Sequence, residues 1–400
     1  MTCFVAAALT AGCASRPAPV PSPDAAPHPP ASCLVAADSA GAPRPVTAVF
    51  ADSAVAERVR LAASVEPPVR LDCEGRALPA LATAWSRDSS GRFWTLQLGA
   101  PAEGTDQPRR TASSLAAAWR SAAPASDALR LSGVESLLPL DQRRLVVGFS
   151  TPRLTLPPLF AAPELGVSGT TPGPTTLTAR APGGDLRDAL DGGADVVVSD
   201  DPMLLDYASR RPGYTRVPLP WSRSYLLLVP AGSSPGSAIP QDTAAFRAGL
   251  ARDAVRADAR PAVAPFWWDT AGDCGNPPAS AGPRRSSAIV YREGDATARE
   301  LAERLVALAG AAGLAAHGLP ADSLSAALRA ASEHAYVVAV PSHPLVPCGV
   351  IADWPAGAAA VGLVETRAHA IIRRGTPPLV VGWDGTLRGP DSVAAHPPSP

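Results

Sequence analysis

The stretch that decides the fold is EPPVRLDCEGRALPALATAWSRDSSGRFWTLQL, residues 66–98. Val69 and Leu71 indicate a short strand, and the acidic, glycine-containing run 72–75 that follows them is typical of a turn. The segment 93–98 alternates apolar side chains with others, which predicts a second strand. We therefore expect two strands here, separated by a turn and a loop.

On either side of this stretch, short apolar runs alternate with segments of helical periodicity. Strands are expected at 46–50, 145–149, 195–198, 225–229, 288–291, 335–340 and 379–381. Helices are expected after Thr111, at 185–190, after Asp242, at 297–312, at 322–331 and at 363–372. Strands that alternate with helices of this length predict an α/β fold.

The composition excludes several classes of protein. All 35 basic residues are arginine, so the chain has no lysine for a phosphate-binding P-loop, a pyridoxal phosphate enzyme or a Schiff-base aldolase. The formal net charge is −1 and no basic block occurs, which argues against a nucleic-acid partner. A chain of 400 residues is long enough for two or three domains.

The N-terminal residues indicate export. Residues 2–12 form an apolar run that is too short to span a bilayer, and it leads into Leu-Thr-Ala-Gly-Cys ending at Cys13. This run resembles a lipoprotein signal peptide, residues 1–13, in which Cys13 becomes the lipidated residue. A buried N-terminal helix is the alternative. Residues 14–32 are proline-rich and predict an extended tether, and 391–400 predict a disordered tail.

Four cysteines remain once Cys3 and Cys13 are assigned to the leader and the lipid anchor. In an exported protein four cysteines predict two disulfides, for which three connectivities exist. The chain has no CxxC sequence, so a zinc ribbon or a thioredoxin-like site is not supported. The four residues are Cys33, Cys73, Cys274 and Cys348.

Several residues of the stretch 66–98 occur in an order that is typical of one protein family. That family opens with a strand, an acidic turn with glycine, a proline, Leu-Ala-x-x-Trp, and then Gly-x-x-Trp-Thr-aliphatic-x-Leu. This chain carries Asp72, Gly75, Pro79, Leu81, Ala82, Trp85, Gly91 and the run 94–98. Looser matches follow at 112–119, 190–195, 246–251 and 302–314. The ordered set resembles extracellular solute-binding protein family 5, the dipeptide- and oligopeptide-binding proteins of ABC importers, over roughly residues 45–385.

The resemblance implies a two-lobed, periplasmic-binding-protein-like (type II) α/β fold with mixed sheets and a hinge. Lobe one would comprise 33–230 plus 376–390, and lobe two 231–375, with hinges near 229–236 and 373–379. Since each cysteine pair would then lie within one lobe, we favour the pairs Cys33–Cys73 and Cys274–Cys348.

Two kinds of residue are candidates for a ligand site. Tryptophans beside expected loops suit the walls of a cleft, although core packing is the alternative for each: Trp221, Trp267, Trp268 and Trp354. Polar residues that follow expected strands are Asp52, Ser53 and Asp200, with helix capping as the alternative for the first two. Peptide-binding members of the family use an aspartate of lobe two for the peptide amine, and Asp353 beside Trp354 is the nearest equivalent.

Catalysis has little support in the sequence. The six histidines form no HExxH pattern, and Cys348 near His343 is better explained by a disulfide than by a thiol site. We therefore expect no enzyme activity, no cofactor and no metal. The leading hypothesis is a monomeric, lipid-anchored protein of the periplasm or cell envelope that passes a peptide or small solute to an ABC permease. The alternatives are an orphan binding or scaffold lipoprotein and a cell-envelope hydrolase.

Overall fold

A computed structural model describes most of the chain between its two ends. The described residues are 33–35, 44–100, 111–168, 177–181, 183–229, 233–234, 243–270, 274, 284–285, 288–310, 313–330 and 334–389. The expected signal peptide with Cys13, the tether 14–32 and the tail 391–400 lie outside them.

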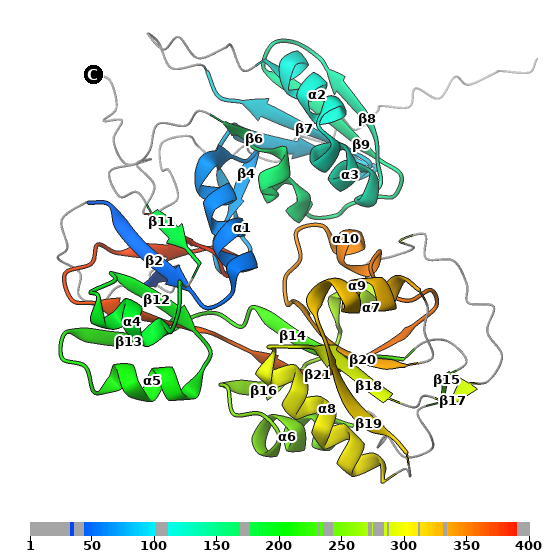
Figure 1. The fold of residues 1–400 in the computed structure, drawn as a ribbon. Helices are drawn as coiled ribbons and strands as arrows, with labels where there is room; N and C mark the ends of the chain where they lie inside the picture. The colour runs from blue at the N-terminus through cyan, green and yellow to red at the C-terminus, as the bar shows by residue number, and fades with distance from the viewer. Residues whose placement is uncertain are drawn as a thin grey trace, which may run out of the picture.

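The three largest sheets, with helices packed on them, form the main layers of the structure (Figure 1). A five-stranded mixed sheet has the order β11(Leu177–Arg180)-β2(Val46–Phe50)-β12(Val196–Ser199)-β22(His369–Arg373)-β13(Tyr214–Pro218). Its first three strands are parallel and β22 is antiparallel to both of its neighbours. Helix α1(Ser53–Ser64) covers one face, and α4(Leu186–Asp191) and α5(Pro202–Ser209) cover the other.

A four-stranded antiparallel sheet stands above this layer in Figure 1 and contains two strands from the second half of the stretch 66–98. Its order is β6(Ala82–Arg87)-β7(Phe93–Leu98)-β9(Arg144–Phe149)-β8(Val134–Pro139). The inward-facing residues of β7, Trp94, Leu96 and Leu98, pack on α2(Ala112–Ser121) and α3(Ala123–Leu131), and the expected strand at 93–98 is confirmed.

Short elements join these two sheets into one lobe. They are the hairpin β4(Val69–Leu71)-β5(Ala77–Pro79), the pair β3(Val65–Glu66)-β10(Val167–Ser168), two 3-10 turns at Pro158–Ala161 and Pro163–Leu165, and the sheet β1(Leu34–Val35)-β23(Leu379–Val381)-β24(Leu387–Arg388). The disulfide Cys33–Cys73 ties β1 to the turn after β4, with a Cα–Cα distance of 5.4 Å.

The second lobe is built on a six-stranded mixed sheet. Its order is β16(Ala259–Pro261)-β21(Ala359–Thr366)-β14(Arg223–Val229)-β20(Ala335–Pro341)-β18(Ala288–Arg292)-β19(Ala315–Leu319), and a short pair, β15(Ser233–Ser234)-β17(Arg284–Arg285), lies apart from it. Helices α6(Ala244–Asp253) and α8(Ala296–Ala309) cover one face. Helices α7(Trp267–Thr270), α9(Ala321–Arg329) and α10(Pro347–Ile351) cover the other. The disulfide Cys274–Cys348 holds the start of α10, so both disulfides have the expected pairing.

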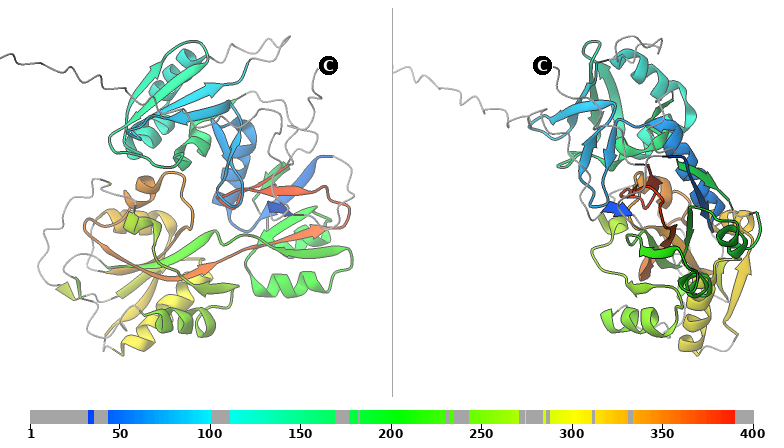
Figure 2. Two further views of the ribbon diagram at one scale, coloured as in Figure 1. Left: turned by 180° about the vertical axis from the view of Figure 1, so that it is seen from behind. Right: turned by 90° about the vertical axis from the view of Figure 1, so that its left-hand side faces the viewer.

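The chain passes between the lobes twice, at residues 219–222 and 367–368 (Figure 2). These crossings precede the expected hinges near 229–236 and 373–379. The reason is that β14 pairs with β20 and β21 in the middle of the second sheet, where its central side chains are buried on both faces. A strand buried on both faces is a continuous apolar run, which does not reveal the sheet to which it belongs.

The expected helix at 363–372 is wrong. Its apolar residues instead belong to two consecutive strands, β21 and β22, each in the interior of a different sheet. An apolar run interrupted by charged residues is compatible with one helix or with two strands, so hydrophobic periodicity alone gave the wrong assignment.

Candidate functional site

Two of the predicted polar residues meet where the lobes join. Strands β2 and β12 are parallel, so the residues that follow them, Asp52 and Asp200, lie at the same edge of the five-stranded sheet. Arg223, the first residue of β14, reaches them from the other lobe. Its Nη2 lies 3.3 Å from Oδ2 of Asp52 and its Nη1 lies 3.7 Å from Oδ2 of Asp200. All three side chains keep about a quarter to a third of their surface exposed, so a charged ligand has access to them.

Local structure fixes each member of this group. Asp52 is also the N-cap of α1, where its Oδ1 accepts the Ala54 N–H at 2.8 Å, and Ser53 is the exposed first residue of that helix. The capping alternative is therefore correct for Asp52. The N-cap of α5 is Asp201, so the Asp200 carboxylate is not needed for capping.

Arg223 is a permanent positive charge between the lobes. Burial alone would lower the pKa of its guanidinium, but the neighbouring Tyr225, Asp200 and Asp295 outweigh burial and raise the pKa. Burial and the nearby Asp295 also raise the pKa of Tyr225, whose hydroxyl donates to Oδ1 of Asp295 at 3.1 Å. Asp295 in turn caps α8. The arginine is thus positioned by groups that tie the junction to a long helix of the second lobe.

A pair of stacked rings also spans the junction. The imidazole of His343, which follows β20, lies against the indole of Trp383, which lies between β23 and β24. The ring centroids are 3.8 Å apart and the planes are inclined by 25°. Burial lowers the pKa of His343, and the positive charge of Arg260 lowers it further, so the imidazole is neutral at pH 7. The sequence did not single out Trp383, because a lone tryptophan shortly after the expected strand 379–381 has no local signal.

Trp221 lies on the first crossing between the lobes and is held by two arginines. The guanidinium of Arg260 lies 4.7 Å from its ring centroid and that of Arg367 lies 4.6 Å from it. Arg367 also binds Asp258, with Nε 2.7 Å from Oδ2. The same Asp258 oxygen lies 3.5 Å from Nε2 of His369, a buried residue of the five-stranded sheet. This cluster joins the two lobes at the crossings.

The remaining predicted tryptophans meet one another in the second lobe. Trp267 and Trp268 have ring centroids 5.4 Å apart, and each lies 6.2 to 6.4 Å from Trp354. They are partly buried against the face of the sheet that α9 covers. Trp267 Nε1 donates to the carbonyl of Pro341 at 3.1 Å, and Pro341 is opposite Arg223 in the sheet. The cluster therefore packs on itself and on the sheet, and this hydrogen bond links it to the strand end opposite Arg223. Asp353, next to Trp354 in the chain, is exposed, and its Oδ1 lies 3.7 Å from Nη1 of Arg329.

The lobes also touch away from the crossings. Val346, just before α10, packs against the core of the four-stranded sheet. A Cβ at Gly349 of α10 would lie 3.7 Å from Leu131 of α3. The lobes therefore meet both at the crossings and at α10, and the groups described above lie at this junction.

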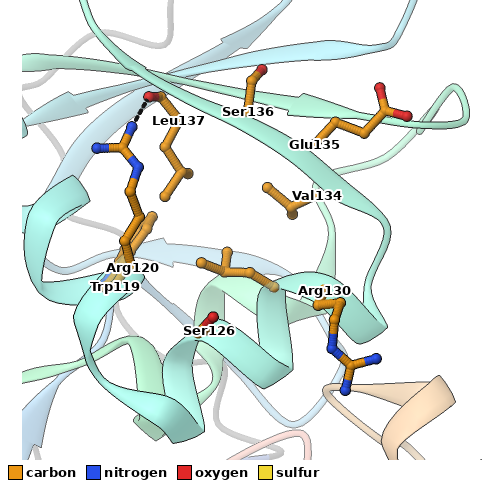
Figure 3. A pocket seen from close by; sticks show the side chains of 9 residues that line it. Trp119, Arg120, Ser126, Arg130, Val134, Glu135, Ser136 and Leu137 are labelled. Atoms are coloured by element: carbon orange, nitrogen blue, oxygen red, sulfur yellow. Dashed lines mark hydrogen bonds between the residues drawn. The ribbon is translucent and has the colours of Figure 1, made fainter.

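A small pocket in the first lobe is unrelated to these groups. It has a volume of about 190 Å³ between α2, α3 and β8 (Figure 3). Arg120 donates to the carbonyl of Leu137 inside it, and Trp119 donates to the carbonyl of Leu165. None of the predicted site residues lines the pocket.

The described residues offer neither a metal site nor a membrane-spanning helix. No cluster of three or more His, Cys, Asp or Glu side chains is arranged to hold a metal ion in the part of the chain that the structure describes. Over the same residues, no helix has the length and apolar character needed to cross a bilayer.

Comparison by sequence returned no match to a family model and no match to a curated protein. Comparison by structure returned many. An oligopeptide-binding protein of Borrelia burgdorferi, OppAIV, has a TM-score of 0.55 at 10% identity, over 82% of this chain and 95% of that one. NikZ of Campylobacter jejuni, solved with Ni(L-His), has a TM-score of 0.56 at 11% identity, over 85% and 97%. DppA of Helicobacter pylori, solved with the peptide STSA, has a TM-score of 0.55 at 9% identity, over 88% and 99%.

These likenesses show that the chain has the two-lobed fold that the resemblance to family 5 predicted. The fold class, with mixed sheets in both lobes, is confirmed. The structural matches extend over 95–99% of those three chains, so this chain has a counterpart for nearly all of each of them.

Proposed function

We propose that this protein binds a small solute, such as a peptide, between its two lobes and delivers it to an ABC importer. The observation that carries the proposal is the Arg223 bridge, in which an arginine of the second lobe contacts Asp52 and Asp200 of the first beside both crossings. Charged groups that meet across a hinge hold a ligand most tightly when the lobes are together, so binding favours closure.

The charges suggest which part of a solute would bind there. Asp52, Asp200 and Arg223 together have a net charge of −1. An ammonium group of the solute would bind the two carboxylates, and a carboxylate of the solute would bind the guanidinium. The fold supports this use, since the similar structures include proteins described as binding a peptide or Ni(L-His).

Thermal unfolding against a panel of di- to tetrapeptides tests the proposal. A solute at a hundred times its Kd should stabilise the protein by about 2.7 kcal/mol. The variants Asp52→Asn and Asp200→Asn should reduce that stabilisation, and Asn at position 52 preserves the helix cap. The control is Asp206→Asn, which changes an exposed pair with Arg210 within α5. An equal loss of solute-induced stabilisation in all three variants, or no stabilisation of the wild type by any solute, would argue for a scaffold role instead.

The finer features belong to the same proposal. Trp267, Trp268, Asp353 and Trp354 stay predictions as ligand contacts, and so does the permease as partner. Cys13 is proposed as the lipid anchor that retains the protein at a membrane of the cell envelope. Labelling cells with a fatty acid should mark the wild type and leave Cys13→Ser unlabelled, whereas equal labelling would exclude this anchor.

A further inference from the structure

The stacked rings of His343 and Trp383 come from different lobes. His343 follows the central strand β20 of the second lobe, and Trp383 follows β23, which pairs with β1 of the first. Because the two rings belong to different lobes, a movement of one lobe relative to the other changes the distance between them. The two rings therefore form the walls of a slot whose width depends on the distance between the lobes.

Trp383 is a rigid wall of this slot. Its ring lies against Gly75, where a Cβ would be only 2.9 Å from the indole Cζ3, so the ring is in close contact with the backbone of this turn. The turn that contains Gly75 is fixed by the buried carboxylate of Asp72, which accepts the backbone N–H groups of Glu74 and Arg76 at 2.9 Å. The disulfide of Cys73 fixes the same turn to β1.

His343 is the wall on the other side. The residue before it is held in two ways, because the Ser342 N–H donates to the Ser222 carbonyl at 2.9 Å and the hydroxyls of Ser342 and Ser224 lie 2.9 Å apart. The lowered pKa of His343 keeps the imidazole neutral, so it offers a flat ring without a charge. Both rings are thus positioned before a ligand arrives.

We propose that a planar ring of the solute enters between His343 and Trp383, so that the protein selects solutes with an aromatic or heteroaromatic group. This inference rests on the proposed function, because it describes the same junction. In the present structure the two rings cover each other at 3.8 Å. A ring placed between them would replace that single contact with two, and would be favoured over an aliphatic group of similar size.

The test compares two peptides that differ in one side chain. We expect Ala-Phe-Ala to bind the wild type about two- to tenfold more tightly than Ala-Leu-Ala in calorimetric titrations, which corresponds to the usual strength of an aromatic pair. Trp383→Leu and His343→Leu should remove the preference, and Trp383→Phe should retain it. The control is Phe93→Leu, which removes an exposed ring from the four-stranded sheet. Melting temperatures verify that each variant is folded.

A second measurement tests the slot between the two rings independently of peptide binding. Indole alone should shift the imidazole signals of His343 in nuclear magnetic resonance spectra, assigned by their loss in His343→Leu, and cyclohexylmethanol should not. Equal binding of both peptides by the wild type would overturn the ring slot and leave solute binding intact. A shift with indole but no binding of either peptide would support the slot and overturn a peptide as the solute. No binding and no shift would overturn both.

Discussion

The Arg223 bridge predicts that one substitution weakens the contact between the lobes. Arg223→Met keeps an unbranched apolar side chain and removes the charge that faces Asp52 at 3.3 Å and Asp200 at 3.7 Å. The three side chains are about a quarter to a third exposed, so each pair is screened by solvent and contributes at the upper end of the range of about 0.2–1 kcal/mol for surface pairs. Two such pairs give a loss of about 1–2 kcal/mol.

The assay is thermal unfolding together with small-angle X-ray scattering. A loss of this size should lower the melting temperature by about 2–8 °C, since about 1 kcal/mol corresponds to roughly 2–4 °C for domains of 150–250 residues. The difference between wild type and variant should shrink in 1 M NaCl, because salt screens pairs of this exposure. The radius of gyration of the variant should increase if the bridge holds the lobes together.

The matched control is Arg210→Met. Its guanidinium lies 2.6 Å from Asp206, which is closer than either pair of Arg223, but both side chains are largely exposed and lie on one helix. We expect little change in melting temperature from this variant. The reasoning is refuted if Arg223→Met has no larger effect than Arg210→Met, or if its effect does not depend on salt.

Three further predictions concern other parts of the chain. Gly75→Ala should destabilise the protein by about 1–2 kcal/mol in urea unfolding, because φ is +79° and the new Cβ would lie 2.9 Å from the Trp383 ring; an unchanged midpoint would show that the turn adapts. Removing the 74-residue cross-link by changing Cys274 and Cys348 to Ser should cost about 4 kcal/mol if chain entropy dominates, and an equal stability of the double variant would contradict that account. Burial lowers the pKa of His369, so the unfolded chain binds a proton at this residue before the folded protein does as the pH falls below about 6.5. The free energy of unfolding should therefore decline from pH 7 to pH 5.5, and His369→Gln should reduce this decline. An identical pH profile of the variant would exclude the effect.

Local patterns predicted much of the fold. The alternation in 93–98 and the apolar run at 46–50 became strands β7 and β2, because one-sided burial and short buried runs leave a direct signal in sequence. The crossings were misplaced because the pairing of β14 with β20 and β21 is set by residues far apart in the chain. The consecutive strands β21 and β22 were mistaken for a helix at 363–372, because an apolar run interrupted by charged residues is compatible with either structure.

The candidate site was predictable only in part. Asp52 and Asp200 were found because they follow parallel strands, whose carboxyl ends share an edge. Arg223 and Trp383 were missed, since what distinguishes them is a partner in the other lobe, more than 150 residues away for the Arg223–Asp52 pair. The tryptophans were selected by residue type, and the structure shows three of them packed on one another.

The central claim is that the two lobes hold a solute between them. Native mass spectrometry of the protein, isolated without refolding, tests this claim most directly. We predict a species heavier than the polypeptide by the mass of a small non-covalent solute, which denaturation releases and which Arg223→Met retains less well. A spectrum that contains only the bare polypeptide, unchanged after incubation with peptide and small-solute mixtures, would contradict the claim.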